Sequence, residues 1–281
     1  MGRGLAAAFR SAGLSVLGVH ARTAREGATS SGLLCEAAQA VLAGVLSDAN
    51  VIIIAVSDGS INDVCRDLVQ TVRANSRAMA KGTVVLNTSG MISPEAYSEL
   101  RTLGFPCGTF HPLAPFATAE RGAAAVRNGW VGIEGDATAC STARRLAAAV
   151  GARTINIPTD AKATYHAAAV MASNFPVVLV ALATRMLVNV GIDERAAGQV
   201  VQQLMRAAVA NLDSGPPAAV LTGPAARNDS AIIAAHRDAM AGDPETAAVY
   251  DALTRAARTL AADHATLVDD ARVGGRREAE G

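Results

Sequence analysis

The chain has 281 residues, which is long enough for two domains that each bury their own core. Hydrophobic residues make up 51% of the sequence and charged residues 18%, so the composition excludes a generally disordered protein. Twenty-five basic residues balance 25 acidic ones and aromatic residues reach only 3%, which argues against a nucleic-acid-binding surface and a polybasic membrane anchor.

The first 25 residues contain four arginines and no acidic residue, as many transit peptides do. The apolar run Leu14–Val19 nevertheless predicts a buried strand after a short helix at Leu5–Ala12. A Rossmann domain places a strand and a G-x-G-x-x-G turn before that helix. Gly2 takes the place of the third glycine, so the first strand and the other glycines are expected upstream. We favour a start assigned too late over a true truncation, which would weaken nucleotide binding.

Short β-branched runs alternate with Ala-rich helical stretches through the first half of the chain. Further strands are predicted at Val51–Val56, Thr83–Asn87, Cys107–Phe110, Val131–Ile133 and Thr154–Ile157. Helices are predicted between them at Glu36–Leu46, Ile61–Ala74, Pro94–Leu103 and Thr138–Val150. This alternation predicts an α/β fold with a Rossmann-type, mainly parallel sheet that is covered by helices on both faces.

Beyond Pro158 only helices are predicted, at Lys162–Val190, Glu194–Leu212, Ser230–Ala241 and Glu245–Val268. We therefore expect a Rossmann-like domain over residues 1–157, an all-helical domain over residues 158–269 and a flexible tail over residues 270–281. The stretch Ala167–Thr184 carries no charge, but it contains polar groups and a proline that would be costly in lipid. It predicts a helix buried between subunits or domains rather than a membrane span, and we expect a homodimer that forms through it.

Four cysteines lie far apart and form no C-x-x-C pair; they are Cys35, Cys65, Cys107 and Cys140. This spacing predicts reduced, mostly buried thiols in a cytoplasmic protein and no metal site.

The end of the second predicted strand indicates which dinucleotide is preferred. An NAD enzyme usually has an acidic residue there to bind the ribose hydroxyls. This chain has Arg22 and Thr23 instead, which favours NADP over NAD, although Arg22 is also interpretable as a surface charge. Together with Gly2, the segment Val56-Ser57-Asp58 after the next strand completes the predicted cofactor-binding set.

Two groups of polar residues are candidates for chemistry. Ser57, Ser89 and His111 follow three strands whose carboxyl ends are expected to meet at one edge of the sheet, although such residues also form ordinary turns. Lys162 and His166 are spaced i and i+4, so they share one face of a predicted helix. Only two of the 25 basic residues are lysines, which draws attention to Lys162, although it is also interpretable as a solvated residue at a helix start.

Three further residues complete the predicted site. Ser173 lies near the face that carries Lys162 and His166, whereas Asn174 is turned further round the helix, and Pro176 should kink it. Arg227 is suited either to hold a substrate carboxylate or to pair with Asp229, which is also a natural helix N-cap.

The motifs in combination resemble those of a known family. They are Val56-Ser-Asp58, Thr88-Ser-Gly90, His111-Pro-Leu113, Tyr165-His-Ala-Ala168, Ser173-Asn174 and Thr222-Gly-Pro224 with Arg227 and Asp229. The chain resembles bacterial Rossmann-like proteins with a C-terminal domain of unknown function 2520, which are relatives of the 6-phosphogluconate dehydrogenase and ketopantoate reductase superfamily. The resemblance implies NADP-linked chemistry and a helical dimerisation domain. In the related dehydrogenases a Lys and an Asn one turn apart face the nicotinamide; Lys162 matches the Lys, and His166 replaces the Asn.

The sequence therefore predicts an NADP(H)-dependent oxidoreductase that acts on a small polar carbonyl or imine compound. Lys162 or His166 is expected to deliver the proton. Ser89, His111 and Asn174 are expected to position the substrate, and Ser173 and Arg227 to bind it. The alternative is a non-catalytic dinucleotide-binding or scaffold protein of the same fold.

Overall fold

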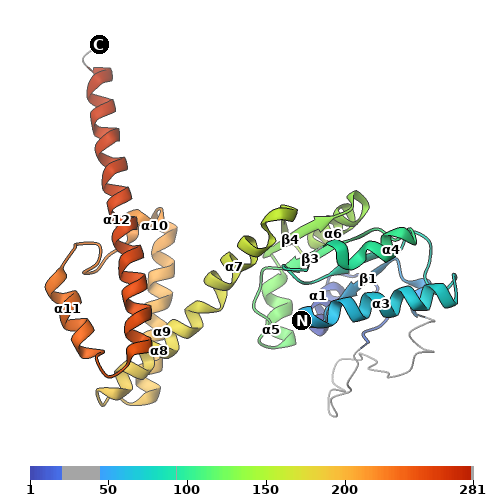
Figure 1. The fold of residues 1–281 in the computed structure, drawn as a ribbon, viewed down its shortest axis with the longest axis horizontal. Helices are drawn as coiled ribbons and strands as arrows, with labels where there is room; N and C mark the ends of the chain where they lie inside the picture. The colour runs from blue at the N-terminus through green and yellow to red at the C-terminus, as the bar shows by residue number, and fades with distance from the viewer. Residues whose placement is uncertain (21–44, 93, 280–281) are drawn as a thin grey trace. The chain divides into compact units, whose positions relative to one another are not determined.

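The computed structural model describes residues 1–20, 45–92 and 94–279 and contains two compact units, Met1–Phe175 and Pro176–Gly281 (Figure 1). The division falls after the first helix that follows the last strand. That helix was expected to open the helical domain from residue 158, but it packs with the sheet unit. Its residues are thus positioned by the sheet.

A five-stranded sheet forms the first unit, in the order β1 (Val51–Ile54), β2 (Val84–Asn87), β3 (Cys107–Pro112), β4 (Trp130–Gly135) and β5 (Arg153–Asn156). All neighbouring strands are parallel except β3 and β4, which are antiparallel and pair His111 with Gly132. The predicted mainly parallel sheet is confirmed. Because β4 runs in reverse, its amino end lies beside the carboxyl end of β3.

Helices cover both faces of this sheet (Figure 1). They are α1 (Gly2–Ser11), α3 (Asp58–Ala74), α4 (Ser98–Thr102), α5 (Ala119–Val126) and α6 (Ala137–Ala149), with one 3-10 turn, η1 (Pro94–Tyr97), before α4. Adjacent strand residues face opposite cores, as the pleat requires: Leu86 packs with Leu5 of α1, whereas Val85 packs with Ile61 of α3. Two cores therefore sandwich the buried strands.

The strand predicted at Leu14–Val19 is wrong, because residues 14–20 have no regular secondary structure. Leu14 and Val16 are partly buried against the core that contains α1, whereas Leu17 is 50% exposed. Packing of alternate side chains thus accounts for the apolar run without strand pairing. Most of the helix predicted at Glu36–Leu46 lies outside the described residues.

After β5 a short 3-10 turn, η2 (Thr159–Ala161), leads into α7 (Lys162–Ser173). Asn174 then interrupts the single helix that was predicted from Lys162 to Val190, and α8 (Phe175–Asn189) begins just before Pro176. Proline fits the first turn of a helix because the backbone N–H groups there have no intrahelical partner. The predicted kink is therefore a break between two helices.

The second unit is helical, as predicted. Its further elements are α9 (Glu194–Ala210), η3 (Asn211–Ser214), α10 (Pro217–Val220), α11 (Ser230–Ala239) and α12 (Pro244–Ala279). Arg185 of α8 pairs with Asp243, just before α12, at 2.8 Å. The helix end predicted at Val268 is wrong, since α12 continues to Ala279 through residues expected to form a flexible tail. Arginine, glutamate and alanine favour helix strongly enough to continue it past the glycine pair Gly274-Gly275.

Candidate active site

Two helices begin at the carboxyl edge of the sheet, next to the end of β1. α3 starts at Asp58, directly after Val56 and Ser57, and the first residue of α1 lies beside the same strand end. A Cβ atom on Gly2 would lie 3.3 Å from Cβ of Ala55, so this glycine permits the close approach. The predicted set Gly2, Val56, Ser57 and Asp58 is thus brought together.

Neither helix receives a side-chain cap at its N-terminus. The Ser57 hydroxyl instead lies 3.0 Å from the hydroxyl of Ser60, and Val56 is 42% exposed. Backbone N–H groups at a helix start bind anions well, because they lack intrahelical acceptors and carry the positive end of the helix dipole. These residues therefore fit the diphosphate of a dinucleotide. The other predicted cofactor contacts, Arg22 and Thr23, lie outside the described residues.

A half-buried cluster of two histidines and one tyrosine forms where β3 ends and α7 begins. The Tyr165 hydroxyl and Nδ1 of His111 share a hydrogen bond of 2.8 Å, and their rings meet edge to face. The ring of His166 lies 6.0 Å from that of His111. Two glycines provide the space: a Cβ on Gly132 would overlap the Tyr165 hydroxyl, and one on Gly90 would lie 3.0 Å from the His111 ring.

Two members of the cluster, His111 and Tyr165, are uncharged at neutral pH. Burial, together with the neighbouring His166 and Lys162, lowers the pKa of His111 to about 4, and only Asp58 acts in the opposite direction. Burial also raises the pKa of Tyr165 to about 12, so its hydroxyl stays protonated at neutral pH. Nδ1 of His166 is buried and has no hydrogen-bond partner among the described residues. The cluster thus offers one hydroxyl and one unpaired imidazole nitrogen.

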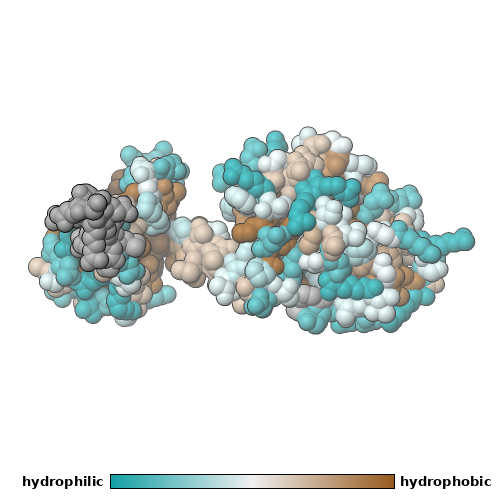
Figure 2. All heavy atoms as spheres, turned by 90° about the horizontal axis from the view of Figure 1, so that it is seen from above, coloured by the Kyte–Doolittle hydropathy of each residue, from teal (hydrophilic) through white to brown (hydrophobic). Residues whose placement is uncertain are grey.

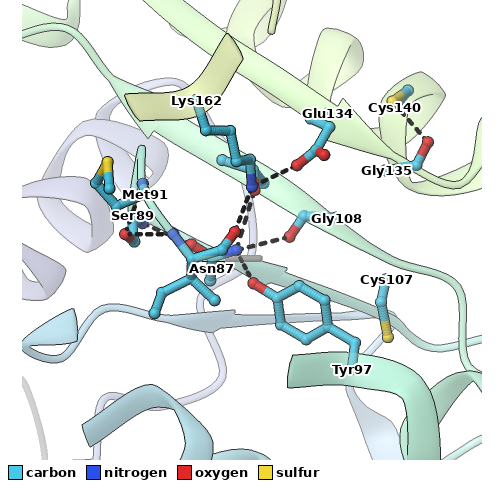
Figure 3. Close-up of polar contacts among 12 residues, drawn as sticks. Asn87, Ser89, Met91, Tyr97, Cys107, Gly108, Glu134, Gly135, Cys140 and Lys162 are labelled. Carbon is cyan, nitrogen blue, oxygen red and sulfur yellow. Dashed lines mark hydrogen bonds and ion pairs between the residues drawn. The ribbon is translucent and has the colours of Figure 1, made fainter. Parts of the chain in front are cut away.

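Lys162 is not a solvated lysine at a helix start. It is 5% exposed, and its ammonium forms an ion pair of 2.5 Å with Oε2 of Glu134 on β4 (Figure 3). It also donates a hydrogen bond to the backbone carbonyl of Ile92. Sequence reasoning missed Glu134, although the signal was present: it is the only acidic residue in the apolar strand Trp130–Gly135.

Ser89 shapes the loop that follows β2. Its hydroxyl oxygen accepts hydrogen bonds from the backbone N–H groups of Met91 (3.0 Å) and Ile92 (3.2 Å). Its own N–H donates to Oδ1 of Asn87 at 2.6 Å, and the Asn87 amide donates in turn to the Tyr97 hydroxyl and to the Gly108 carbonyl (Figure 3). Ser89 therefore forms the turn that was considered as its alternative role.

Two predicted site residues lie away from this cluster in the first unit, and a third belongs to the second unit. Ser173 and Asn174 are exposed at the other end of α7, about two turns or roughly 10 Å beyond His166. The Ser173 hydroxyl donates to the carbonyl of Ala169 at 2.7 Å. Arg227 belongs to the second unit, where Asp229 caps α11 by accepting from the Ile232 N–H; no ion pair joins these two described residues, Arg227 and Asp229. The structure thus brings together Ser89, His111, Lys162 and His166.

One family model matches the chain, from the fourth strand into the helical second unit. Residues 130–257 match the family model of the domain of unknown function DUF2520. No curated protein matches the sequence. Among solved structures, a candidate NADP oxidoreductase from Bacteroides fragilis aligns with 92% of this chain and 93% of its own, at 22% identity and a TM-score of 0.73.

Two further solved structures also align with most of the chain. The protein TM1727 from Thermotoga maritima has 25% identity and a TM-score of 0.60, with 75% of this chain and 78% of that chain covered. A pyrroline carboxylate reductase from Plasmodium falciparum, solved with NADP bound, has 8% identity and a TM-score of 0.57, with 92% of each chain covered. These likenesses confirm the predicted fold, a Rossmann-type sheet followed by a helical region.

Proposed function

We propose that this chain, which has a Rossmann-type sheet and matches DUF2520 over residues 130–257, is an NADP(H)-dependent oxidoreductase that acts on a small polar carbonyl or imine. One observation carries the proposal: the half-buried cluster of His111, Tyr165 and His166 adjoins the sheet edge where two helices begin without side-chain caps. The carboxylate of Asp58, in the first turn of α3, is close enough to His111 to influence its pKa. Dinucleotide site and proton-handling groups would thus be neighbours.

The chain's part in binding the dinucleotide falls to backbone groups. The first turn of α1 at Gly2 and the segment Val56–Asp58 would hold its diphosphate. The preference for NADP over NAD rests on Arg22 and Thr23. When bound, the dinucleotide supplies or accepts the hydride, and the chain's own residues bind and orient the substrate and move the proton.

The His111–Tyr165 pair is suited to donate a proton to a substrate oxygen or nitrogen. Neutral His111 that carries its proton on Nδ1 donates to the Tyr165 oxygen, which leaves the Tyr165 O–H free to face the substrate. As Tyr165 gives its proton to the substrate, His111 passes its Nδ1 proton to the Tyr165 oxygen. Solvent then supplies a proton to Nε2 of His111, which stays neutral. The unpartnered Nδ1 of His166 would hold a polar group of the substrate.

The test uses the single tryptophan, Trp130, which is 45% exposed on β4. Energy transfer from Trp130 to NADPH reports binding, and oxidation of NADPH with a panel of small carbonyl and imine compounds reports turnover. We expect Tyr165→Phe to lower kcat by about 100-fold or more while the NADPH Kd stays unchanged. Tyr250→Phe is the matched control, because Tyr250 forms a similar 2.7 Å hydrogen bond with His236 in the second unit.

Three outcomes of this experiment contradict the proposal. Equal loss of binding and turnover in Tyr165→Phe would make this residue structural. Binding of NADPH without turnover of any compound would identify a non-catalytic dinucleotide-binding protein. Absence of binding would remove the dinucleotide from the function altogether.

The exposed apolar side chains of the second unit support a homodimer, which we propose as the working form. Val177 and Val190, in and just after α8, are 69% and 75% exposed, and Leu204 of α9 is 65% exposed. In Figure 2 the surface of α7 is likewise pale to brown, with few hydrophilic side chains. Monomeric proteins rarely expose such surface, so a second copy is the occupant we expect.

The same helices raise the question of a membrane. Residues Thr159–Asn189 are long and apolar enough to cross one by length and composition, and they are the only such segment in the described part of the chain. The segment carries a buried ion pair at one end, through Lys162, and an ion pair between Arg185 and Asp243 near the other. Charges at these positions would be costly in lipid, which favours a protein partner.

A further inference from the structure

Three segments of the first unit meet at one atom, the side-chain nitrogen of Lys162. Lys162 is the first residue of α7, Glu134 lies on β4, and Ile92 follows the Ser89 turn after β2. The Lys162 and Glu134 side chains are only 6% and 8% exposed. A single buried ammonium therefore fastens the start of α7 to a strand and to a loop.

The next turn of α7 carries the proton-handling groups. Tyr165 lies three residues beyond Lys162 and reaches His111, with its hydroxyl over Gly132 of β4. Gly132 and Glu134 are two residues apart on one strand, so they face the same side of the sheet. The ion pair and the Tyr165 contact thus fasten α7 to the same strand face, one helical turn apart.

Lys162 is poorly placed to act on a substrate itself. Two of the three N–H donors of its ammonium are committed to Glu134 and Ile92 inside the protein. A proton donor must come within hydrogen-bond distance of the group that it protonates. At 5% exposure, Lys162 is shielded from such a group.

We propose that Glu134 and Lys162 are a positioning pair, which holds α7 on the sheet so that Tyr165 stays at His111, and that Lys162 is not the proton donor. The catalytic consequence of this pair rests on the proposed function. Small errors in position are costly in catalysis, because a displacement of about 1 Å can reduce the rate by about 100-fold. The pair therefore controls kcat without touching the substrate.

The experiment compares variants that remove one charge of the Glu134–Lys162 pair with a variant that removes both. Glu134→Gln and Lys162→Met each leave one buried partner uncompensated, whereas the double variant Glu134→Leu/Lys162→Met replaces both with apolar side chains of similar size, which buried sites often tolerate. We expect each single variant to lose about 100-fold in kcat with an unchanged NADPH Kd, and the double variant to recover to within about tenfold of the wild type. Glu99→Gln, which breaks the exposed pair with Arg73, is the matched control.

A second measurement needs no substrate. Histidine NMR titration of the free protein follows His111, whose pKa is about 4 while α7 covers it. In the single variants we expect this pKa to rise toward the ordinary value of 6.5, and in the double variant to stay well below it. The charge of Lys162 makes the smallest contribution to the lowering, so its removal alone should change the pKa of His111 little.

The outcomes distinguish the two proposals. A double variant as inactive as Lys162→Met, but with a low His111 pKa, would make Lys162 the proton donor and overturn the positioning role. An unchanged His111 pKa in both single variants would also overturn it. A wild-type protein that binds NADPH but turns over nothing would contradict the proposed function, while the NMR titration would still decide whether the pair positions α7.

Discussion

At the scale of single residues, the site depends on keeping the half-buried His111 neutral. Its imidazole is covered by Tyr165, and burial makes the charged form unfavourable. The hydrogen bond with the Tyr165 hydroxyl satisfies Nδ1 without requiring a charge. A neutral histidine can switch which nitrogen carries its proton, and this property lets it pass a proton on.

The same neutrality predicts a pH dependence of stability. In the unfolded chain the pKa of His111 has its ordinary value of 6.5, and in the folded chain it is about 4, so the unfolded chain binds more protons between these pH values. The contribution is fully present above pH 6.5 and is lost as the pH falls toward 4. Relative to His111→Gln, the wild type should lose about 3 kcal/mol over this range. Urea unfolding followed by Trp130 fluorescence measures the difference, and parallel curves for the two proteins would contradict it.

At the scale of elements, the docking of α7 depends on what β4 lacks. Gly132 leaves open the space that the Tyr165 hydroxyl occupies, because a Cβ atom there would overlap it. The neighbouring strand residues, Val131 and Ile133, are buried in the core on the other face. One face of β4 therefore leaves a space for the helix at Gly132, and the other face belongs to a packed core.

A side chain that fills the space over Gly132 should displace Tyr165. We expect Gly132→Ala to lower kcat by about 100-fold and to destabilise the fold by about 1–3 kcal/mol, because a methyl group forced into a packed contact shifts its neighbours. Gly198→Ala is the control: a Cβ there, on α9, meets nothing within 4 Å, and alanine favours helix by about 1 kcal/mol. Steady-state kinetics and urea unfolding test both variants. Wild-type kinetics in Gly132→Ala would show that Tyr165 does not need this position.

Local pattern predicted most of the elements but not the contacts between them. The β-branched runs at β1 to β5 were recognised because their period and length are local properties. Leu14–Val19 has the same pattern, but no ladder forms there, and strand pairing is a property of two segments. The Glu134–Lys162 pair was missed for the same reason: each residue alone is ambiguous, and only the fold brings them together.

At the scale of the whole molecule, the apolar surface of the second unit predicts association. We expect light scattering to give twice the chain mass of 28.5 kDa, and Val177→Glu to yield a monomer, because a charge is costly in a buried apolar interface. Leu103→Glu, at an exposed leucine of the sheet unit, is the control that should remain a dimer. A monomeric wild type would contradict the homodimer. Co-sedimentation with lipid vesicles would point to a membrane instead.

The membership of α7 in the sheet unit has a consequence for synthesis on the ribosome. His111 is made 54 residues before its partner Tyr165, which at about 5–20 residues per second is a delay of roughly 3–10 s. During this interval β4 is also made, and until α7 emerges His111 is uncovered and the space over Gly132 is unfilled. A fragment that ends at residue 157 would preserve this unfinished state permanently, whereas one that ends at Phe175 would contain the whole cluster. The emerging α7 thus completes the cluster last. A chaperone that binds the uncovered strand at Gly132 would have to leave before α7 can pack there.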